Sequence, residues 1–196
     1  MRSLIVLFLF SSVSVFPQGD VQKSEGKKIQ TIKETSIAGN EKKFFVEINV
    51  TQTSSYCGGA RPSPEMIEQL GTPTPLAEKK LYIKKGEKNT FDSNIFLEIS
   101  SDTSGKIQLL LPSGKYFIVD ESKKGKSSYN ALLKRFAKAS NNYTEVNKNC
   151  LKNWFEQPDF VFEINEADSK GLRINFHKGC IWTETPCVHY TGPKPP

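Results

Sequence analysis

The sequence lacks any long hydrophobic segment, and it shows no heptad or Gly-X-Y repeat. Its apolar run Leu4–Phe10 is shorter than the ~20 residues that a membrane-spanning helix requires. The missing repeats exclude a long coiled coil and collagen. The chain has 196 residues, of which 37% are hydrophobic, and this length and composition predict a single domain with a modest core.

The sequence also lacks the short motifs that mark common catalytic sites. It contains no G-x-S-x-G elbow, no H-E-x-x-H motif, no phosphate-binding loop and no G-x-G-x-x-G. We therefore expect that the protein is not an enzyme and that it carries no cofactor. One alternative hypothesis stays open, in which Cys57 is the reactive thiol of a hydrolase or a redox enzyme.

The excess of positive charge is small. The chain has 27 Lys or Arg and 21 Asp or Glu, so its formal net charge is +6. Lysine pairs are interspersed with acidic residues, as at Lys79–Lys80, Lys84–Lys85 and Lys123–Lys124. This pattern predicts a solvated surface rather than a nucleic-acid-binding stripe, and we expect no nucleic-acid partner.

Residues 1–19 have the three-part order of a secretory signal peptide. Arg2 is positive, an apolar run follows, and small residues then lead to the helix-breaking Pro17. We expect that cleavage leaves a secreted or periplasmic protein without a membrane span. Residues 20–42 are polar and rich in lysine, which predicts a flexible N-terminal arm.

Residues 43–196 are expected to form a single β-sandwich domain, because apolar and polar side chains alternate in seven short runs from Phe44 onward. Turn residues such as Lys85-Gly86 and Pro112-Ser-Gly114 separate the runs. The predicted strands are 44–52, 81–85, 95–100, 107–111, 116–119, 160–164 and 172–176. Their spacing predicts a mainly β fold, a seven-stranded antiparallel Ig-like or transthyretin-like β-sandwich with one or two short inserted helices.

Two segments are predicted to be helical. Ser63 and Pro64 begin a short helix that ends at Gly71. The second helix, about 127–139, lies in a helical insertion of about 121–157. Its apolar residues recur at helical spacing, and they are Tyr129, Leu132, Leu133, Phe136 and Ala137. This stripe is expected to pack on the sandwich; the alternative is a helix that contacts a partner or a membrane surface.

One segment carries a family resemblance. The pattern Asp102-x-x-Gly105, followed by Pro112-x-Gly114-x-Tyr116, resembles the hairpin of carboxypeptidase regulatory-like and Cna-B-type domains. The likeness covers about residues 74–119 and implies a transthyretin-like, or prealbumin-like, sandwich. The whole chain also resembles an uncharacterised group of secreted proteins from Bacteroidetes-type bacteria, and that second resemblance implies no activity.

All four cysteines are expected at one end of the sandwich. If consecutive strands alternate in direction, the 54–79 loop, the insertion and the Cys- and Pro-containing C-terminal tail share that end. The cysteines there are Cys57, Cys150, Cys180 and Cys187. An even count in an exported protein favours disulfides. A final hairpin turning near Asp168 would favour Cys150–Cys187 and Cys57–Cys180, and a Cys180–Cys187 bond is the main alternative.

Aromatic residues gather at the same end, and they are Tyr56, Trp154, Phe155 and Trp182. Exposed, they would form a binding surface; buried, they would cap the sandwich. The sequence therefore predicts a secreted, non-catalytic binding or structural module whose contact surface lies on the loop-rich end near the cysteines. Its expected partner is an unknown protein or glycan of the cell envelope.

A second hypothesis for this end is a metal site. The candidate ligands are His177, Cys180, Cys187 and His189. Thiolate and imidazole donors suit zinc or copper, so the alternative function is that of an exported metal-binding protein.

Overall fold

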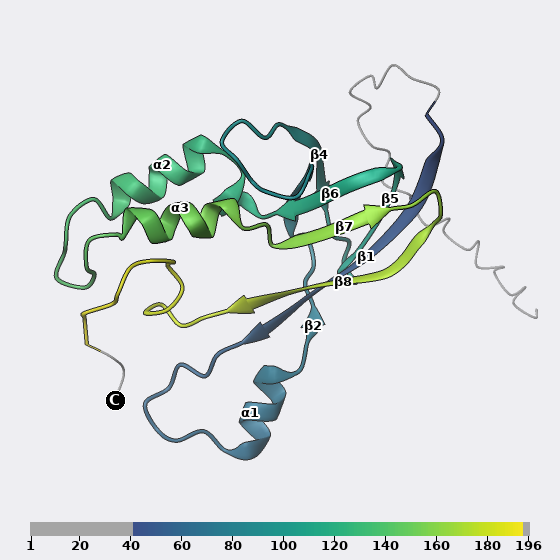
Figure 1. The fold of residues 1–196 in the computed structure, drawn as a ribbon. Coiled ribbons are helices and arrows are strands. Elements are labelled where there is room, and N and C mark those ends of the chain that lie inside the picture. Colours follow the sequence, from purple (N-terminus) through teal and green to yellow (C-terminus); the bar gives the residue numbers. More distant parts are fainter. Residues whose placement is uncertain (1–40, 194–196) are drawn as a thin grey trace, which may run out of the picture.

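The computed structural model describes residues 41–193. The signal peptide predicted for 1–19, and almost all of the arm predicted for 20–42, lie outside these residues. Within them, no helix is long and apolar enough to cross a membrane. The described chain forms two four-stranded sheets, and two long connections, 55–73 and 120–159, contain its helices (Figure 1).

The first sheet is built around β1 (Lys43–Ser54), its longest strand. One edge of β1 pairs antiparallel with β5 (Lys106–Pro112) and then with the two-residue β2 (Thr74–Pro75). The other edge pairs in parallel with β8 (Ser169–Lys178). Because they are parallel, β1 and β8 run in one direction and finish at the same end of the sheet (Figure 1).

The second sheet has the order β4–β3–β6–β7, and all of its pairs are antiparallel. Its strands are β4 (Ile95–Ser100), β3 (Lys80–Lys85), β6 (Gly114–Val119) and β7 (Phe160–Ile164).

The core lies between the sheets and follows directly from the alternation in the sequence. Val46 and Ile48 of β1, Leu81 and Ile83 of β3, and Ile118 of β6 have no exposed surface, and they belong to one apolar cluster. The predicted mainly β sandwich is therefore confirmed. It has eight strands rather than seven, since β2 adds a short pairing, and one of its pairs is parallel.

Two turns that read as hairpins in the sequence are corners between the sheets. β5 and β6 belong to different sheets, and so do β7 and β8, so the predicted final hairpin is wrong. At the first corner Gly114 has a φ of 144°, a conformation that favours glycine. The hydroxyl of Tyr116 donates to the carbonyl oxygen of Pro112 at 3.0 Å and braces this corner.

The predicted short helix is present as α1 (Pro64–Gly71), and the Ser63 side chain accepts a hydrogen bond from the backbone N–H of Met66 at 3.2 Å. The helix projects away from the sandwich (Figure 1). Its apolar residues Met66 and Ile67 remain 42% and 57% exposed.

The insertion contains η1 (Glu121–Lys123) and two helices, α2 (Lys126–Arg135) and α3 (Lys148–Glu156), which lie side by side (Figure 1). α2 ends four residues earlier than predicted. Its apolar stripe faces inward, but it does not pack on the sandwich as predicted. Phe136 is buried in a second apolar cluster whose other members come from α2 itself, α3, the segment between the helices and the C-terminal tail. α3 lies inside the predicted helical insertion, but no sequence pattern above predicts it as a separate helix.

The insertion buries part of the second sheet's outer face. Tyr82, Phe117 and Val119 form a third apolar cluster there. Lys84 lies on the same face with no exposed surface, and Lys123 is also buried. The prediction that these two lysines lie on a solvated surface is therefore wrong, since alternation alone does not show which outer face a later segment covers.

Candidate functional site

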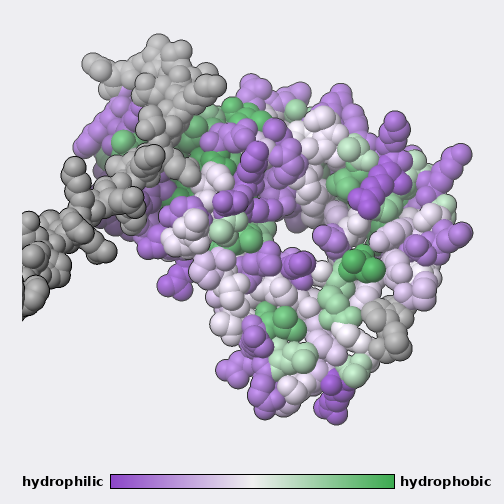
Figure 2. All heavy atoms as spheres, turned by 180° about the vertical axis from the view of Figure 1, so that it is seen from behind, coloured by the Kyte–Doolittle hydropathy of each residue, from purple (hydrophilic) through white to green (hydrophobic). Residues whose placement is uncertain are grey.

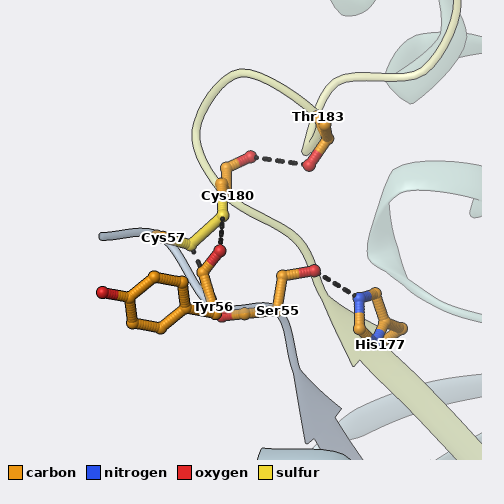
Figure 3. The surroundings of a disulfide bond; sticks show 6 residues. All are labelled: Ser55, Tyr56, Cys57, His177, Cys180 and Thr183. Atoms are coloured by element: carbon orange, nitrogen blue, oxygen red, sulfur yellow. Dashed lines mark hydrogen bonds between the residues drawn. A yellow bond between two sulfur atoms is a disulfide. The ribbon is translucent and has the colours of Figure 1, made fainter. Parts of the chain in front are cut away.

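Both disulfides lie at the end where β1 and β8 finish. Cys57 follows β1 and is bonded to Cys180, which follows β8 (Figure 3). Cys150 of α3 is bonded to Cys187. This is the pairing that the register argument favoured, although the hairpin behind that argument does not exist. The parallel pairing of β1 with β8 is what brings Cys57 and Cys180 together.

Residues 181–186, which we call the strap, lie between Cys180 and Cys187 and are therefore fixed at both ends. One disulfide ties the strap to the end of β1, and the other ties it to α3. The hydroxyl of Tyr143, in the insertion, also donates to the carbonyl oxygen of Ile181 at 3.4 Å. The strap thus joins the sandwich to the insertion.

A cleft of about 780 Å³ lies between the strand ends, the insertion and the strap. Seen from behind, the surface is largely hydrophilic with scattered hydrophobic groups, and it is hollowed in its middle (Figure 2). All three parts of the chain contribute side chains to the cleft. They include Gln52, Phe176 and Lys178 from the strand ends, Arg135, Tyr143 and Trp154 from the insertion, and Ile181, Glu184 and Pro186 from the strap.

Two aromatic rings in the cleft each carry a lysine that is itself paired with an acid. The Lys79 ammonium lies 4.7 Å from the Phe176 ring centroid and 3.5 Å from the Asp120 carboxylate. The Lys123 ammonium lies 4.7 Å from the Trp154 centroid and 2.7 Å from the Asp159 carboxylate. These contacts fix the two rings by cation–π attraction and ion pairing.

The two lysine pairs are also connected to each other. Asp159 accepts a hydrogen bond from the backbone N–H of Asp120 at 2.8 Å. In contrast, Arg135, Lys178 and Glu184 line the cleft without an ion pair to any described residue. Their charges are thus available to a ligand.

His177 belongs to a chain of polar contacts between β1 and β8. Its Nε2 lies 2.7 Å from the Ser55 hydroxyl, and its Nδ1 lies 3.1 Å from the Thr53 hydroxyl (Figure 3 shows the Ser55 contact). Asn175 donates to Thr53 at 3.1 Å and extends the chain along the strands. Both ring nitrogens therefore already have protein partners.

The predicted metal-binding residues do not form a thiolate–imidazole site. Cys180 and Cys187 are in two different disulfides, so neither offers a thiolate. His177 is engaged by hydroxyls, and among residues 41–193 no group of three His, Cys, Asp or Glu is placed to hold a metal ion. The disulfide at Cys57 likewise removes the proposed reactive thiol.

The four predicted aromatics do not form one platform. Phe155 has no exposed surface and stacks on Phe91 with centroids 4.9 Å apart, which removes it from any contact surface. Trp154 is partly buried and lines the cleft. Tyr56 lines a separate pocket of about 540 Å³ beside α1, and Trp182 packs near Tyr190.

Three residues that line the cleft were not predicted from the sequence, and they are Phe176, Tyr143 and Arg135. Phe176 is the last inward-facing residue of a predicted strand, and its position at the cysteine end was a usable signal. Tyr143 and Arg135 lie in the insertion, where no strand pattern could place them.

A buried polar network fastens the insertion to the second sheet. The Lys84 ammonium donates to the Asn89 side-chain oxygen at 2.6 Å, and both residues are fully buried. The Asn89 amide donates to the carbonyl oxygens of Lys123 and Phe155 at 2.8 and 2.9 Å. Burial lowers the pKa of Lys84, because the charged form loses its hydration.

A second polar group lies close by. Burial raises the pKa of the Tyr82 hydroxyl, and its hydrogen bond to Glu121 adds to the effect. Lys124 also donates to Tyr82, at 3.1 Å. These contacts hold the start of the insertion against β3.

No protein-family model matches the chain, and no curated protein matches it in sequence. Among solved structures, the Bacillus anthracis TIE protein is 17% identical with a TM-score of 0.32, and the match covers 69% of this chain and 17% of that one. GBS52, the minor pilin of Streptococcus agalactiae, is 10% identical with a TM-score of 0.33, covering 74% and 48%.

A mutant of the shaft pilin SpaA from Lactobacillus rhamnosus GG is also similar, with 10% identity, a TM-score of 0.34 and coverage of 70% and 50%. The chain thus spans half or less of each of these proteins. Because these TM-scores are low, the evidence for the β-sandwich and for the cleft is this chain's own structure. Membership of a carboxypeptidase regulatory-like, Cna-B-type or Bacteroidetes family stays a prediction.

Proposed function

We propose that this protein is an exported, non-catalytic binding module that holds a protein or glycan of the cell envelope in the cleft beside the strap. The observation that carries the proposal is the strap itself, which forms one wall of the cleft and is bonded at both ends. A cleft wall fixed in this way loses little conformational freedom when a ligand binds, which favours affinity.

Three further features support a binding role. The rings of Phe176 and Trp154 are held by paired lysines, so they present preorganised apolar surface. Unpaired charges at the cleft supply polar contacts that could fix the orientation of a ligand. Two disulfides fit an oxidising compartment, such as the periplasm or the cell exterior.

The proposal is tested by titrating the oxidised, signal-cleaved protein with two probes, a soluble envelope polysaccharide fraction and a soluble envelope protein fraction. Trp154→Leu and Lys178→Ala alter the cleft, and Ile67→Ser on α1 is the control. We expect the cleft variants to weaken binding by about tenfold, as is usual for central contacts. Equal binding by all variants, or an equal loss with Ile67→Ser, would contradict the proposal.

A further inference from the structure

The positive charge of the protein is concentrated in the insertion. Residues 121–157 contain eight Lys or Arg and three Glu, a net charge of +5. The remaining described residues, 41–120 and 158–193, contain 13 basic and 15 acidic residues, a net charge of −2. The sandwich is thus slightly acidic, while the helices attached to it are strongly basic.

Most of this charge is at the surface and unpaired. Of the eight basic residues, Lys123, Lys124 and Lys152 form ion pairs with acidic side chains. The other five are exposed and have no ion pair to a described residue, and they are Lys126, Lys134, Arg135, Lys138 and Lys148. We call these five residues the basic face; they are spread over the exposed surface of α2, the segment after it and the start of α3, and not along one side of a single helix.

The basic face has no apolar centre. No large apolar residue of the insertion is among the exposed ones, because its apolar stripe is turned into the second cluster around Phe136. Membrane-surface helices bury an apolar face in the lipid, and specific protein interfaces have an apolar core. The surface therefore suits a hydrophilic polyanion better than a bilayer or a folded protein.

The basic face is continuous with the cleft, because Arg135 belongs to both. The cleft also contains Trp154, whose ring can pack against the apolar face of a sugar. Cations spread over two helices, leading to an aromatic cleft, match a polymer that repeats its anionic groups along its length.

We infer that the ligand is an acidic polysaccharide, whose carboxylates contact the basic face while one of its sugar units occupies the cleft. This inference rests on the proposed function and names its ligand class. Attraction between exposed charges is screened by salt, so binding is expected to weaken steadily as ionic strength rises.

The test uses the oxidised, signal-cleaved chain and three probes: polygalacturonate, uncharged dextran, and vesicles containing phosphatidylglycerol. The variant Lys134→Glu/Lys138→Glu/Lys148→Glu reverses three charges on the basic face. Its control, Lys80→Glu/Lys88→Glu/Arg173→Glu, makes the same charge change at exposed positions of the sandwich.

We expect polygalacturonate to bind, dextran to bind far more weakly, and the basic-face variant to lose at least about tenfold in affinity, with less than about a threefold loss in the control. Equal losses in both variants, preference for the vesicles, or no binding to polygalacturonate would overturn the inference. A different result separates the two proposals: if Trp154→Leu weakens binding to an envelope fraction but polygalacturonate does not bind, the proposed function stands and its ligand is not an acidic polysaccharide.

Discussion

Cys57 and Cys180 extend the parallel pairing of β1 with β8 beyond its last register pair, Ser54 with Lys178. Parallel strands leave a sheet side by side, so two segments separated by 123 residues are close enough for a disulfide. A cross-link over such a distance restricts the unfolded chain strongly.

We therefore expect Cys57→Ala/Cys180→Ala to lower the free energy of unfolding by about 2–4 kcal/mol. Chemical denaturation of the oxidised variant and the oxidised wild-type protein measures this difference. A loss below about 0.5 kcal/mol would show that this bond adds little to the pairing of β1 with β8.

The second disulfide, between Cys150 and Cys187, is expected to act locally. Val188 follows it and packs into the apolar cluster around Phe136. In Cys150→Ser/Cys187→Ser we expect faster amide exchange in α3 and in the strap, with the core strands protected as before. Uniformly faster exchange across both sheets would mean that the insertion and the sandwich unfold together.

Asn89, between β3 and β4, is expected to be the most sensitive residue of the polar network that holds the insertion. Asn89→Ala removes two hydrogen bonds to backbone carbonyls and leaves Lys84 without its acceptor. We expect a loss of about 2–4 kcal/mol in unfolding free energy. The control is Asn147→Ala, which removes one helix cap on Cys150 and should cost about 1 kcal/mol. Equal costs would show that the network does not hold the insertion.

Lys84 makes stability depend on pH. Its pKa is lowered by burial from the ordinary value of 10.5, so the unfolded chain binds more protons between the folded pKa and 10.5. The free energy of unfolding should rise with pH across that window.

Lys84→Met should remove this rise, whatever its effect on stability at neutral pH. Unfolding curves are compared up to about pH 9.5, below the range in which tyrosines titrate. The raised pKa values of Tyr82 and Tyr116 make the free energy of unfolding fall as pH rises, but mainly above pH 9.5, where tyrosines of the unfolded chain lose their protons. Identical slopes for the variant and the wild type would contradict the assignment.

The local features of the fold could be predicted from the sequence. Alternation identified the inward-facing residues of each strand, such as Val46 and Ile48, and the Ser63 cap identified α1. Strand directions alone placed the cysteines at one end. These features depend on neighbouring residues, or on the simple up-and-down order of the chain.

Sheet membership could not be predicted, because a corner and a hairpin use the same turn residues. Pro112 and Gly114 therefore read as a hairpin, although β5 and β6 lie in different sheets. The parallel pairing of the first and last long strands leaves no local signal either. α3 has a local signal, an Asn147 cap with Leu151 and Phe155 four residues apart, but the mostly polar residues around them weaken the helical pattern.

The cleft depends on long-range contacts, so its residues were predicted in part. Trp154 was identified by type and position, whereas Phe155, its neighbour, points into the core. Neighbouring positions on a helix face different directions. Which of the two aromatic side chains faces the cleft therefore depends on how α3 lies against the rest of the chain.

The most direct test of the strap is disulfide mapping of the exported, unreduced protein by mass spectrometry of its peptides. We expect two cross-linked pairs, Cys57 with Cys180 and Cys150 with Cys187, and no free thiol. A Cys180–Cys187 bond, or free thiols at these positions, would release the strap from β1 and α3 and contradict the preformed cleft.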